Sequence, residues 1–156
     1  MKKLLLLTLL CFLPLLGAKA QNIQVENLKG EKVLFSEIIK GDMPVVVSFW
    51  ATWCKPCMME MEAFKEIQDE WDGKVRIVSI SIDDSRSKSK VPSLVKGRSL
   101  PFEIFLDPNK SLYNSLNALG VPYTFIFHKG KQVYSHSGYT PGDEEVVIEK
   151  ALKYTK

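Results

Sequence analysis

The sequence predicts an α/β fold in which helices flank a mixed central sheet, and three observations lead to this class. Apolar, β-branched runs typical of buried strands alternate with segments of helical periodicity over residues 44–119. Two short extended stretches form a hairpin before this region, and a second hairpin and a helix follow it. Alternation of strand and helix gives parallel strands, whereas a hairpin adds antiparallel ones, so we expect a mixed sheet.

The first elements are short. Residues 23–27 and 31–35 are extended stretches, and the Leu28-Lys29-Gly30 segment between them has the composition of a tight turn. Ser36 begins a helical turn that runs through Ile39 and ends before Gly41. Residues 44–50 then form a continuous apolar run, whose length suits a strand buried on both faces.

A long helix is expected after this strand and up to Gly73. Beyond residue 57, apolar residues recur at steps of three and four and should face the core: Met58, Met61, Phe64, Ile67 and Trp71. Residues 75–82 predict a second buried strand, and a helix follows within residues 87–96, closing at Gly97. Pro92 within that helix indicates either a kink or a later start.

The last third of the chain is expected to complete the sheet. Residues 102–106 predict a strand, and residues 109–119 a short helix that ends at Gly120. Residues 123–127 and 131–135 flank His128-Lys129-Gly130 and predict the second hairpin. A final helix opens at Pro141 or Asp143. The residues expected on its inner face are Val146, Val147, Ala151 and Leu152.

The first twenty residues have the composition of a secretory signal peptide. Lys2 and Lys3 give a positive start, an apolar segment follows, and small residues precede a predicted cleavage after Ala20. The apolar segment contains Pro14 and is short for a bilayer span of about 20 residues, which favours cleavage over an uncleaved anchor. This leaves one ordinary domain over residues 21–156 of an exported protein.

Cleavage changes both the charge and the cysteine content. The first twenty residues hold three lysines and no acid, so their loss takes the formal net charge from +3 to zero, and nothing favours a nucleic-acid partner. Only Cys54 and Cys57 remain. An exported protein lies where disulfides persist, but a loop this small stabilises a fold little, so the pair is better suited to redox chemistry.

The Cys54-Lys55-Pro56-Cys57 segment lies between a predicted strand and a predicted helix. At the start of a helix, free backbone N–H groups and the helix dipole stabilise a thiolate at Cys54, and the thiolate is the species that attacks a disulfide. Cys57 lies one turn further on and can resolve the mixed disulfide, while Pro56 suits the first turn.

The sequence offers little to hold a metal or a cofactor, so neither is predicted. There is no second cysteine pair. The only histidines, His128 and His136, belong to the second hairpin, where a solvated strand or turn is expected.

The segment from Phe49 to Cys57 resembles the signature of the thioredoxin superfamily. Further segments are similar to its exported TlpA/ResA-like branch, and they lie at residues 27–31, 33–39, 81–84, 100–108 and 120–126. The resemblance covers nearly all of residues 22–154. It implies a thioredoxin-like fold with an N-terminal β-hairpin extension, and thiol–disulfide oxidoreductase activity.

The resemblance also implies roles for single residues. Pro122 would be cis and would place the backbone of Val121 beside Cys54, as an edge for an extended substrate segment; Trp53 would shield the disulfide, although ordinary hydrophobic packing is its alternative. Glu60 matches an acid thought to move protons between the two thiols, and a buried carboxyl with a raised pKa suits that work. A solvated surface glutamate is the alternative for Glu60.

Two positions depart from thioredoxins proper. Ser48 stands where those proteins carry a buried aspartate, and a hydroxyl cannot ionise usefully, which gives Glu60 or water more of the proton transfer. Lys55 stands where a glycine is common. A cation beside Cys54 favours its thiolate and makes the disulfide more oxidising.

The sequence therefore predicts an exported oxidoreductase, in the periplasm or on the outer side of the cytoplasmic membrane. The resemblance suggests that a membrane thiol carrier supplies its electrons and that protein disulfides, including those of apocytochrome c in cytochrome c maturation, are its substrates. A peroxide-reducing relative is less favoured, because no Pro-x-x-x-Thr-x-x-Cys spacing occurs upstream of Cys54. A metal- or haem-handling chaperone that uses the cysteine pair is the alternative from another class.

Overall fold

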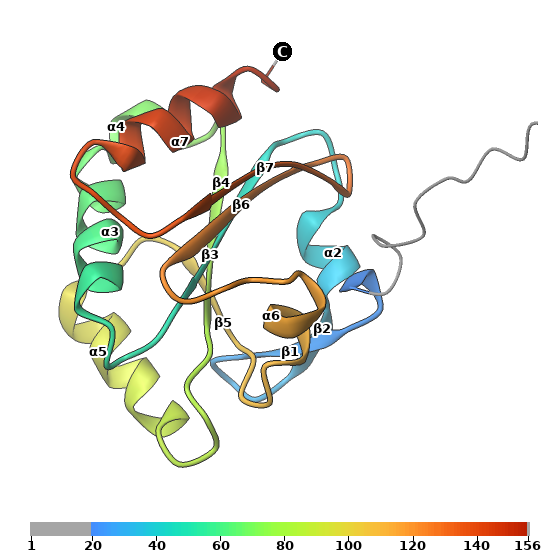
Figure 1. Ribbon diagram of the computed structural model, residues 1–156, viewed down its shortest axis with the longest axis vertical. Helices are drawn as coiled ribbons and strands as arrows, with labels where there is room; N and C mark the ends of the chain where they lie inside the picture. Colours follow the sequence, from blue (N-terminus) through green and yellow to red (C-terminus); the bar gives the residue numbers. More distant parts are fainter. Residues whose placement is uncertain (1–19, 156) are drawn as a thin grey trace, which may run out of the picture.

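A single seven-stranded sheet in the order β2-β1-β5-β4-β3-β6-β7 runs through the computed structural model, which describes residues 20–155 (Figure 1). The strands are β1 (Gln24–Asn27), β2 (Lys32–Leu34), β3 (Val45–Trp50), β4 (Arg76–Ser81), β5 (Glu103–Leu106), β6 (Tyr123–His128) and β7 (Lys131–Ser137). The predicted signal peptide falls outside the described residues, apart from Ala20.

Helices cover both faces of the sheet, with α3, α4, α5 and α7 on one side and α2 and α6 on the other (Figure 1). The helices are α2 (Phe35–Ile39), α3 (Lys55–Glu66), α4 (Gln68–Trp71), α5 (Val91–Arg98), α6 (Ser111–Ser115) and α7 (Asp143–Leu152). No helix among residues 20–155 combines the length and the apolar character that a membrane crossing requires.

The strand pairing confirms the predicted mixed sheet. β3 pairs with β4 and β4 with β5 in parallel, as expected for strands joined by the α3 and α5 crossovers. β6 pairs antiparallel with β3 and with β7, and β1 pairs antiparallel with β2 and β5. The N-terminal hairpin is thus part of the main sheet.

The strand predicted to be buried on both faces is β3, and all six of its residues are buried. It lies at the centre of the sheet between β4 and β6. Aromatic rings fill the face opposite α3, where Phe125 meets Phe49 edge to face with ring centroids 6.1 Å apart. This rigid centre fixes the point at which β3 ends and the segment with the two cysteines begins.

The predicted long helix up to Gly73 is in fact two helices. α3 ends at Glu66, because Ile67 leaves helical geometry (φ −97°, ψ 25°), and α4 follows as one turn. The break lets the Trp71 ring turn back into the core, where its Nε1 donates a hydrogen bond to the Phe64 carbonyl oxygen at 2.7 Å. Met58 and Ile67 are only partly buried.

Other helix boundaries also differ from the prediction. Pro92 marks a later start: a 3-10 turn (Lys88–Lys90) precedes α5, which begins at Val91 and runs past Gly97 until Ser99 takes a left-handed conformation. α6 is shorter than the predicted 109–119, and Asn117 beyond it has a positive φ.

The predicted inner face of the last helix was partly wrong. Val146 is 44% exposed, whereas Ile148, which the prediction left out, is buried. The core-facing positions of α7 are Val147, Ile148 and Ala151. At about 100° per residue, Val146 lies about 200° from Ile148 around the helix and therefore faces away from the core.

Candidate active site

The two cysteines form a disulfide at the start of α3, with their Cα atoms 5.3 Å apart. Cys54 is the N-cap residue of the helix, and its Sγ accepts a hydrogen bond from the Cys57 backbone N–H at 3.2 Å. Cys54 keeps 5% exposure, whereas Cys57 is fully buried. An approaching reactant therefore reaches the sulfur of Cys54 first.

The local charges favour a thiolate at Cys54 once the disulfide is reduced. The backbone N–H groups and the positive dipole end of the twelve-residue α3 point at this position. The first turn of α3 contains no acidic residue and begins with exposed Lys55, while Pro56 fills a position that needs no backbone N–H. The effect of Lys55 and Pro56 on the redox chemistry of the cysteines stays a prediction.

Asp83 anchors the segment that joins β3 to Cys54, and sequence reasoning missed it. Its buried carboxylate accepts hydrogen bonds from the Thr52 N–H at 2.8 Å, the Thr52 hydroxyl at 2.6 Å and the Ser81 hydroxyl at 2.7 Å. Burial by itself raises the pKa of Asp83, but the bonds from Thr52 and Ser81 outweigh it, and the pKa lies below its ordinary value. An aspartate at the carboxyl end of a buried strand was the signal in the sequence.

Glu60 lies inside the protein, so its interpretation as a solvated surface residue is wrong. Only 3% of it is exposed, and its carboxyl accepts hydrogen bonds from the Ser48 hydroxyl at 2.6 Å and the Thr124 hydroxyl at 2.8 Å. Burial raises the pKa of Glu60 to about 7, although both hydrogen bonds act in the opposite direction. A carboxyl with this pKa can both take up and release a proton near neutral pH.

Ser48 on β3 and Glu60 on α3 are thus joined by a buried hydrogen bond, in which the hydroxyl donates to the carboxyl. Glu60 also lies three residues after Cys57, hence on the same side of α3. The buried carboxyl and the buried sulfur are neighbours along one helix face.

The Val121–Pro122 peptide bond is cis, as the resemblance implied. The pairing of Phe49 with Tyr123 places this loop beside the end of β3, where the cysteine segment begins. Trp53 next to Cys54 is 66% exposed, so most of its ring is not packed in the core. Leu119, two residues before Val121, is 80% exposed and was not singled out from the sequence.

The histidines are less solvated than predicted. His136 lies on β7 opposite Thr124, and its side chain is 28% exposed and within 3.1 Å of an Asp143 oxygen. Nδ1 of His128 is buried. Across residues 20–155, His, Cys, Asp and Glu side chains form no group of three or more that could hold a metal ion.

Comparisons with known proteins agree with this architecture. The chain is similar to the thioredoxin-like protein YneN of Bacillus subtilis, with 32% identity over 111 residues, which cover 70% of this chain and 64% of the relative. It is 29% identical over 119 residues to the thiol-disulfide oxidoreductase ResA of Bacillus cereus, covering 76% of this chain and 66% of ResA. The chain thus spans slightly under two thirds of the length of these relatives.

The fold itself recurs in a solved structure. An uncharacterized thioredoxin-like protein from Porphyromonas gingivalis superimposes with a TM-score of 0.75 and 34% identity, covering 86% of this chain and 90% of that protein. The architecture is thioredoxin-like, as the sequence predicted. The model of the AhpC/TSA family matches residues 16–136, most of the sheet and the whole cysteine segment included. The chain belongs to the AhpC/TSA family.

Proposed function

We propose that this protein is an extracytoplasmic thiol–disulfide oxidoreductase that reduces protein disulfides through Cys54 and Cys57. The observation that carries the proposal is the pair itself: Cys54 at the start of α3 keeps 5% exposure and is bonded to the fully buried Cys57 one turn further on. The similarity to a protein named thiol-disulfide oxidoreductase ResA supports it. The composition of residues 1–20 supports export.

The reaction begins with the reduced protein. The Cys54 thiolate attacks one sulfur of the substrate disulfide, a bond between Cys54 and that sulfur forms, and the substrate bond breaks. The bonding electron pair leaves on the second substrate sulfur, which takes up a proton. The exposed apolar side chain of Trp53 and the backbone at Val121 offer the substrate segment a surface beside Cys54.

The second step releases the substrate. Cys57 gives its proton to the Glu60 carboxylate, and the new thiolate attacks Cys54 Sγ. The Cys54–Cys57 bond forms, the mixed disulfide breaks, and its electron pair leaves on the first substrate sulfur, which is then protonated. The substrate has gained two electrons and two protons, and the protein is left in the disulfide form seen in the structure. A dithiol donor, which we expect to be a membrane thiol carrier, reduces it again.

Reduction of insulin disulfides with dithiothreitol as electron donor tests the activity. We expect the protein to accelerate the reaction, and Cys54→Ser to abolish the acceleration because the attacking sulfur is lost. Cys57→Ser should keep the first step but not the second, so substrates stay attached to Cys54 and can be captured from the exported fraction of producing cells. Normal activity of Cys54→Ser, or no acceleration by the protein with both cysteines, would contradict the proposal.

The role of Glu60 is tested in the second step. Glu60→Gln cannot accept a proton, so release of a thiol-linked peptide from Cys54 should slow by about 100-fold or more and lose its dependence on pH near 7. Glu66→Gln on the exposed face of the same helix is the matched control. Equal rates and equal pH profiles for the two variants would remove Glu60 from the mechanism.

A further inference from the structure

A row of polar side chains crosses three strands next to Glu60. Ser48 on β3 lies opposite Thr124 on β6, and Thr124 lies opposite His136 on β7. Residues directly opposite one another in paired strands point to the same face of a sheet. The row therefore faces α3 and α7, and it leads from the buried carboxyl of Glu60 towards the edge strand.

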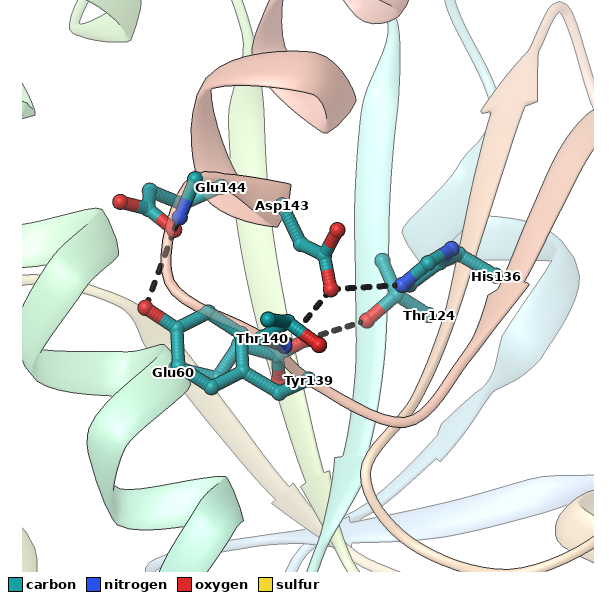
Figure 2. A network of polar contacts seen from close by, with 8 residues as sticks. Glu60, Thr124, His136, Tyr139, Thr140, Asp143 and Glu144 are labelled. Atoms are coloured by element: carbon teal, nitrogen blue, oxygen red, sulfur yellow. Dashed lines mark hydrogen bonds and ion pairs between the residues drawn. The ribbon is translucent and has the colours of Figure 1, made fainter.

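His136 ends the row in a close contact with α7. Its Nε2 lies 3.1 Å from Asp143 Oδ2, and the same oxygen accepts the Thr140 backbone N–H at 2.7 Å. Because an ionised carboxylate only accepts hydrogen bonds, Nε2 carries the hydrogen. Figure 2 shows the His136–Asp143 contact directly beside the contact between Thr124 and Glu60.

Every element packed around Glu60 contributes groups that bear on its charge. On α3 itself, Cys57 lies one turn before Glu60. The two hydroxyl donors are Ser48 on β3 and Thr124 on β6. β7 presents His136, α7 presents Asp143 and Glu144, and the intervening loop presents Tyr139.

The groups on β7, the loop and α7 act in different directions. A charged His136 lowers the pKa of Glu60, and the Asp143 carboxylate raises it. Tyr139 donates its hydroxyl hydrogen to Glu144 at 3.0 Å, and its pKa is raised, chiefly by burial, so it stays neutral.

We propose that His136 and Asp143 act as a positioning pair that controls the charge of Glu60, and through it the deprotonation of Cys57. When His136 is protonated, its positive charge favours the Glu60 carboxylate, which is the form that accepts the proton of Cys57. When His136 is neutral, the negative charge of Asp143 is uncompensated and favours the protonated carboxyl. This inference rests on the proposed role of Glu60 as the base.

The side chains of His136 and Asp143 are in contact with solvent, whereas Glu60 is buried. The side chains of His136 and Asp143 are each 28% exposed, whereas Glu60 is 3% exposed. Imidazole is the side chain that ordinarily changes charge between pH 5 and 8, which is also the range in which Glu60 titrates. Two interacting groups that titrate together share their protonation steps. The pair thus makes the charge of the buried Glu60 depend on the pH of the solvent.

The test measures the pKa of the Glu60 carboxyl directly, by NMR titration of protein whose glutamate side chains are labelled with ¹³C. His136→Gln removes the cation and leaves Asp143 in place, so the pKa of Glu60 should rise by about half a pH unit or more. The double variant His136→Gln/Asp143→Asn removes both charges and should reverse that rise. Glu145→Gln, an exposed residue in the same first turn of α7, is the control and should change nothing.

A kinetic measurement accompanies the titration. The release of a peptide from Cys54 by Cys57 is measured as a rate against pH. The midpoint of this profile should move to higher pH in His136→Gln and return in the double variant, as the pKa of Glu60 does. Unfolding curves of each variant identify any that do not fold.

The outcomes separate this inference from the proposed function. If Glu60→Gln abolishes the pH dependence while His136→Gln shifts neither the carboxyl titration nor the kinetic profile, Glu60 is the base and the pair does not control it. A rise in the pKa of Glu60 that the double variant His136→Gln/Asp143→Asn fails to reverse would overturn the inference as well. If Glu60→Gln behaves like Glu66→Gln, the proposed base itself is wrong.

Discussion

At the scale of a single residue, two opposing effects set the pKa of the Glu60 carboxyl. Burial favours its neutral form, whereas two hydroxyl donors favour its carboxylate, and burial is the larger effect. Neither Ser48 nor Thr124 bears a charge, so they stabilise the carboxylate without fixing it as an ion pair would. This balance holds the pKa near 7, where a group that must alternately accept and release a proton works best.

The raised pKa of Glu60 has a consequence for stability. Its folded-state pKa of about 7 lies above the ordinary 4.5, so the folded protein binds more protons than the unfolded chain between these values. The stability contributed by the neutral carboxyl is complete below pH 4.5 and is lost as the pH rises through 7. Glu60→Gln is neutral at every pH, so its free energy of unfolding should gain up to about 3 kcal/mol relative to the unsubstituted protein between pH 4.5 and 8.

Urea denaturation of the oxidised protein and of Glu60→Gln at several pH values measures this difference. Ionising groups that do not interact with Glu60 affect both proteins equally and cancel. Glu66→Gln serves as the control, because its side chain is exposed on the same helix. Parallel stability curves for Glu60→Gln and the unsubstituted protein would show that Glu60 does not titrate with a raised pKa.

A second prediction concerns Ser48. Ser48→Ala removes the 2.6 Å hydrogen bond that stabilises the Glu60 carboxylate, so the pKa of Glu60 should rise further, by about half a pH unit or more. Ser79→Ala is the matched control, since Ser79 lies opposite Ser48 on β4, is equally buried, and is not a hydrogen-bond partner of Glu60. Carboxyl titration by NMR compares the two, and an equal effect of both substitutions would mean that the hydroxyl itself is unimportant.

At the scale of elements, the position of the start of α3 depends on β4 as well as on β3, the strand that precedes α3. β3 delivers the chain to Thr52, but Asp83, just beyond β4, holds Thr52 through its backbone and its hydroxyl. The parallel pairing of β3 with β4 brings these two strand ends together. The position of Cys54 is therefore a property of two adjacent strands and the turn between β3 and α3.

Replacing Asp83 tests this anchor. Asp83→Asn offers one acceptor oxygen where the carboxylate offers two, and its amide group faces N–H and O–H donors. We expect a loss of about 1 to 3 kcal/mol in the free energy of unfolding. We also expect slower insulin reduction at temperatures where the protein is fully folded. Asp84→Asn, the next residue, whose carboxylate serves only its own turn, should affect the reduction rate much less. Equal rates for both variants would show that the anchor does not position Cys54.

The sequence predicted most elements and the site cysteines, because those depend on local patterns. The apolar run of β3 and the cysteine spacing are readable from neighbouring residues, whereas the cis form of the Val121–Pro122 bond was implied only by the resemblance to a known family. Helix ends were less well predicted, since the break at Ile67 and the stop at Ser99 depend on how Trp71 and Leu100 pack.

The polar row next to Glu60 could not be predicted in the same way. Which residue of β7 lies opposite Thr124 is a matter of strand register, and the bulge between Ile126 and Phe127 shifts that register further along the pair. His136 consequently looked remote from the site in the sequence, although in the fold it lies in the same row as Ser48 and Thr124.

At the scale of the whole molecule, the N-terminal hairpin is built into the core. β1 pairs with β5 at residues 26 and 27, and Lys88 reaches across to Glu26 with its Nζ 2.6 Å from the carboxylate. α2 then packs Phe35 against the far side of the sheet, where its ring meets Phe127 edge to face at 5.2 Å between centroids. The hairpin thus extends the sheet beyond β5, and α2, together with α6, covers the face opposite α3 and α7.

This arrangement predicts that the hairpin region supports stability without taking part in the chemistry. Phe35 is fully buried, so Phe35→Ala should lower the free energy of unfolding by about 3 to 5 kcal/mol through lost contacts and the cavity left behind. Its neighbour Leu34, 38% exposed, supplies the control Leu34→Ala with a much smaller loss. Urea denaturation measures both. Because Phe35 lies on the face opposite α3, insulin reduction by the folded Phe35→Ala protein should match that of the unsubstituted protein at low temperature. A loss below 1 kcal/mol would mean that the hairpin and α2 are an appendage to an independently stable sheet, and slower reduction by fully folded protein would mean that this face is coupled to Cys54.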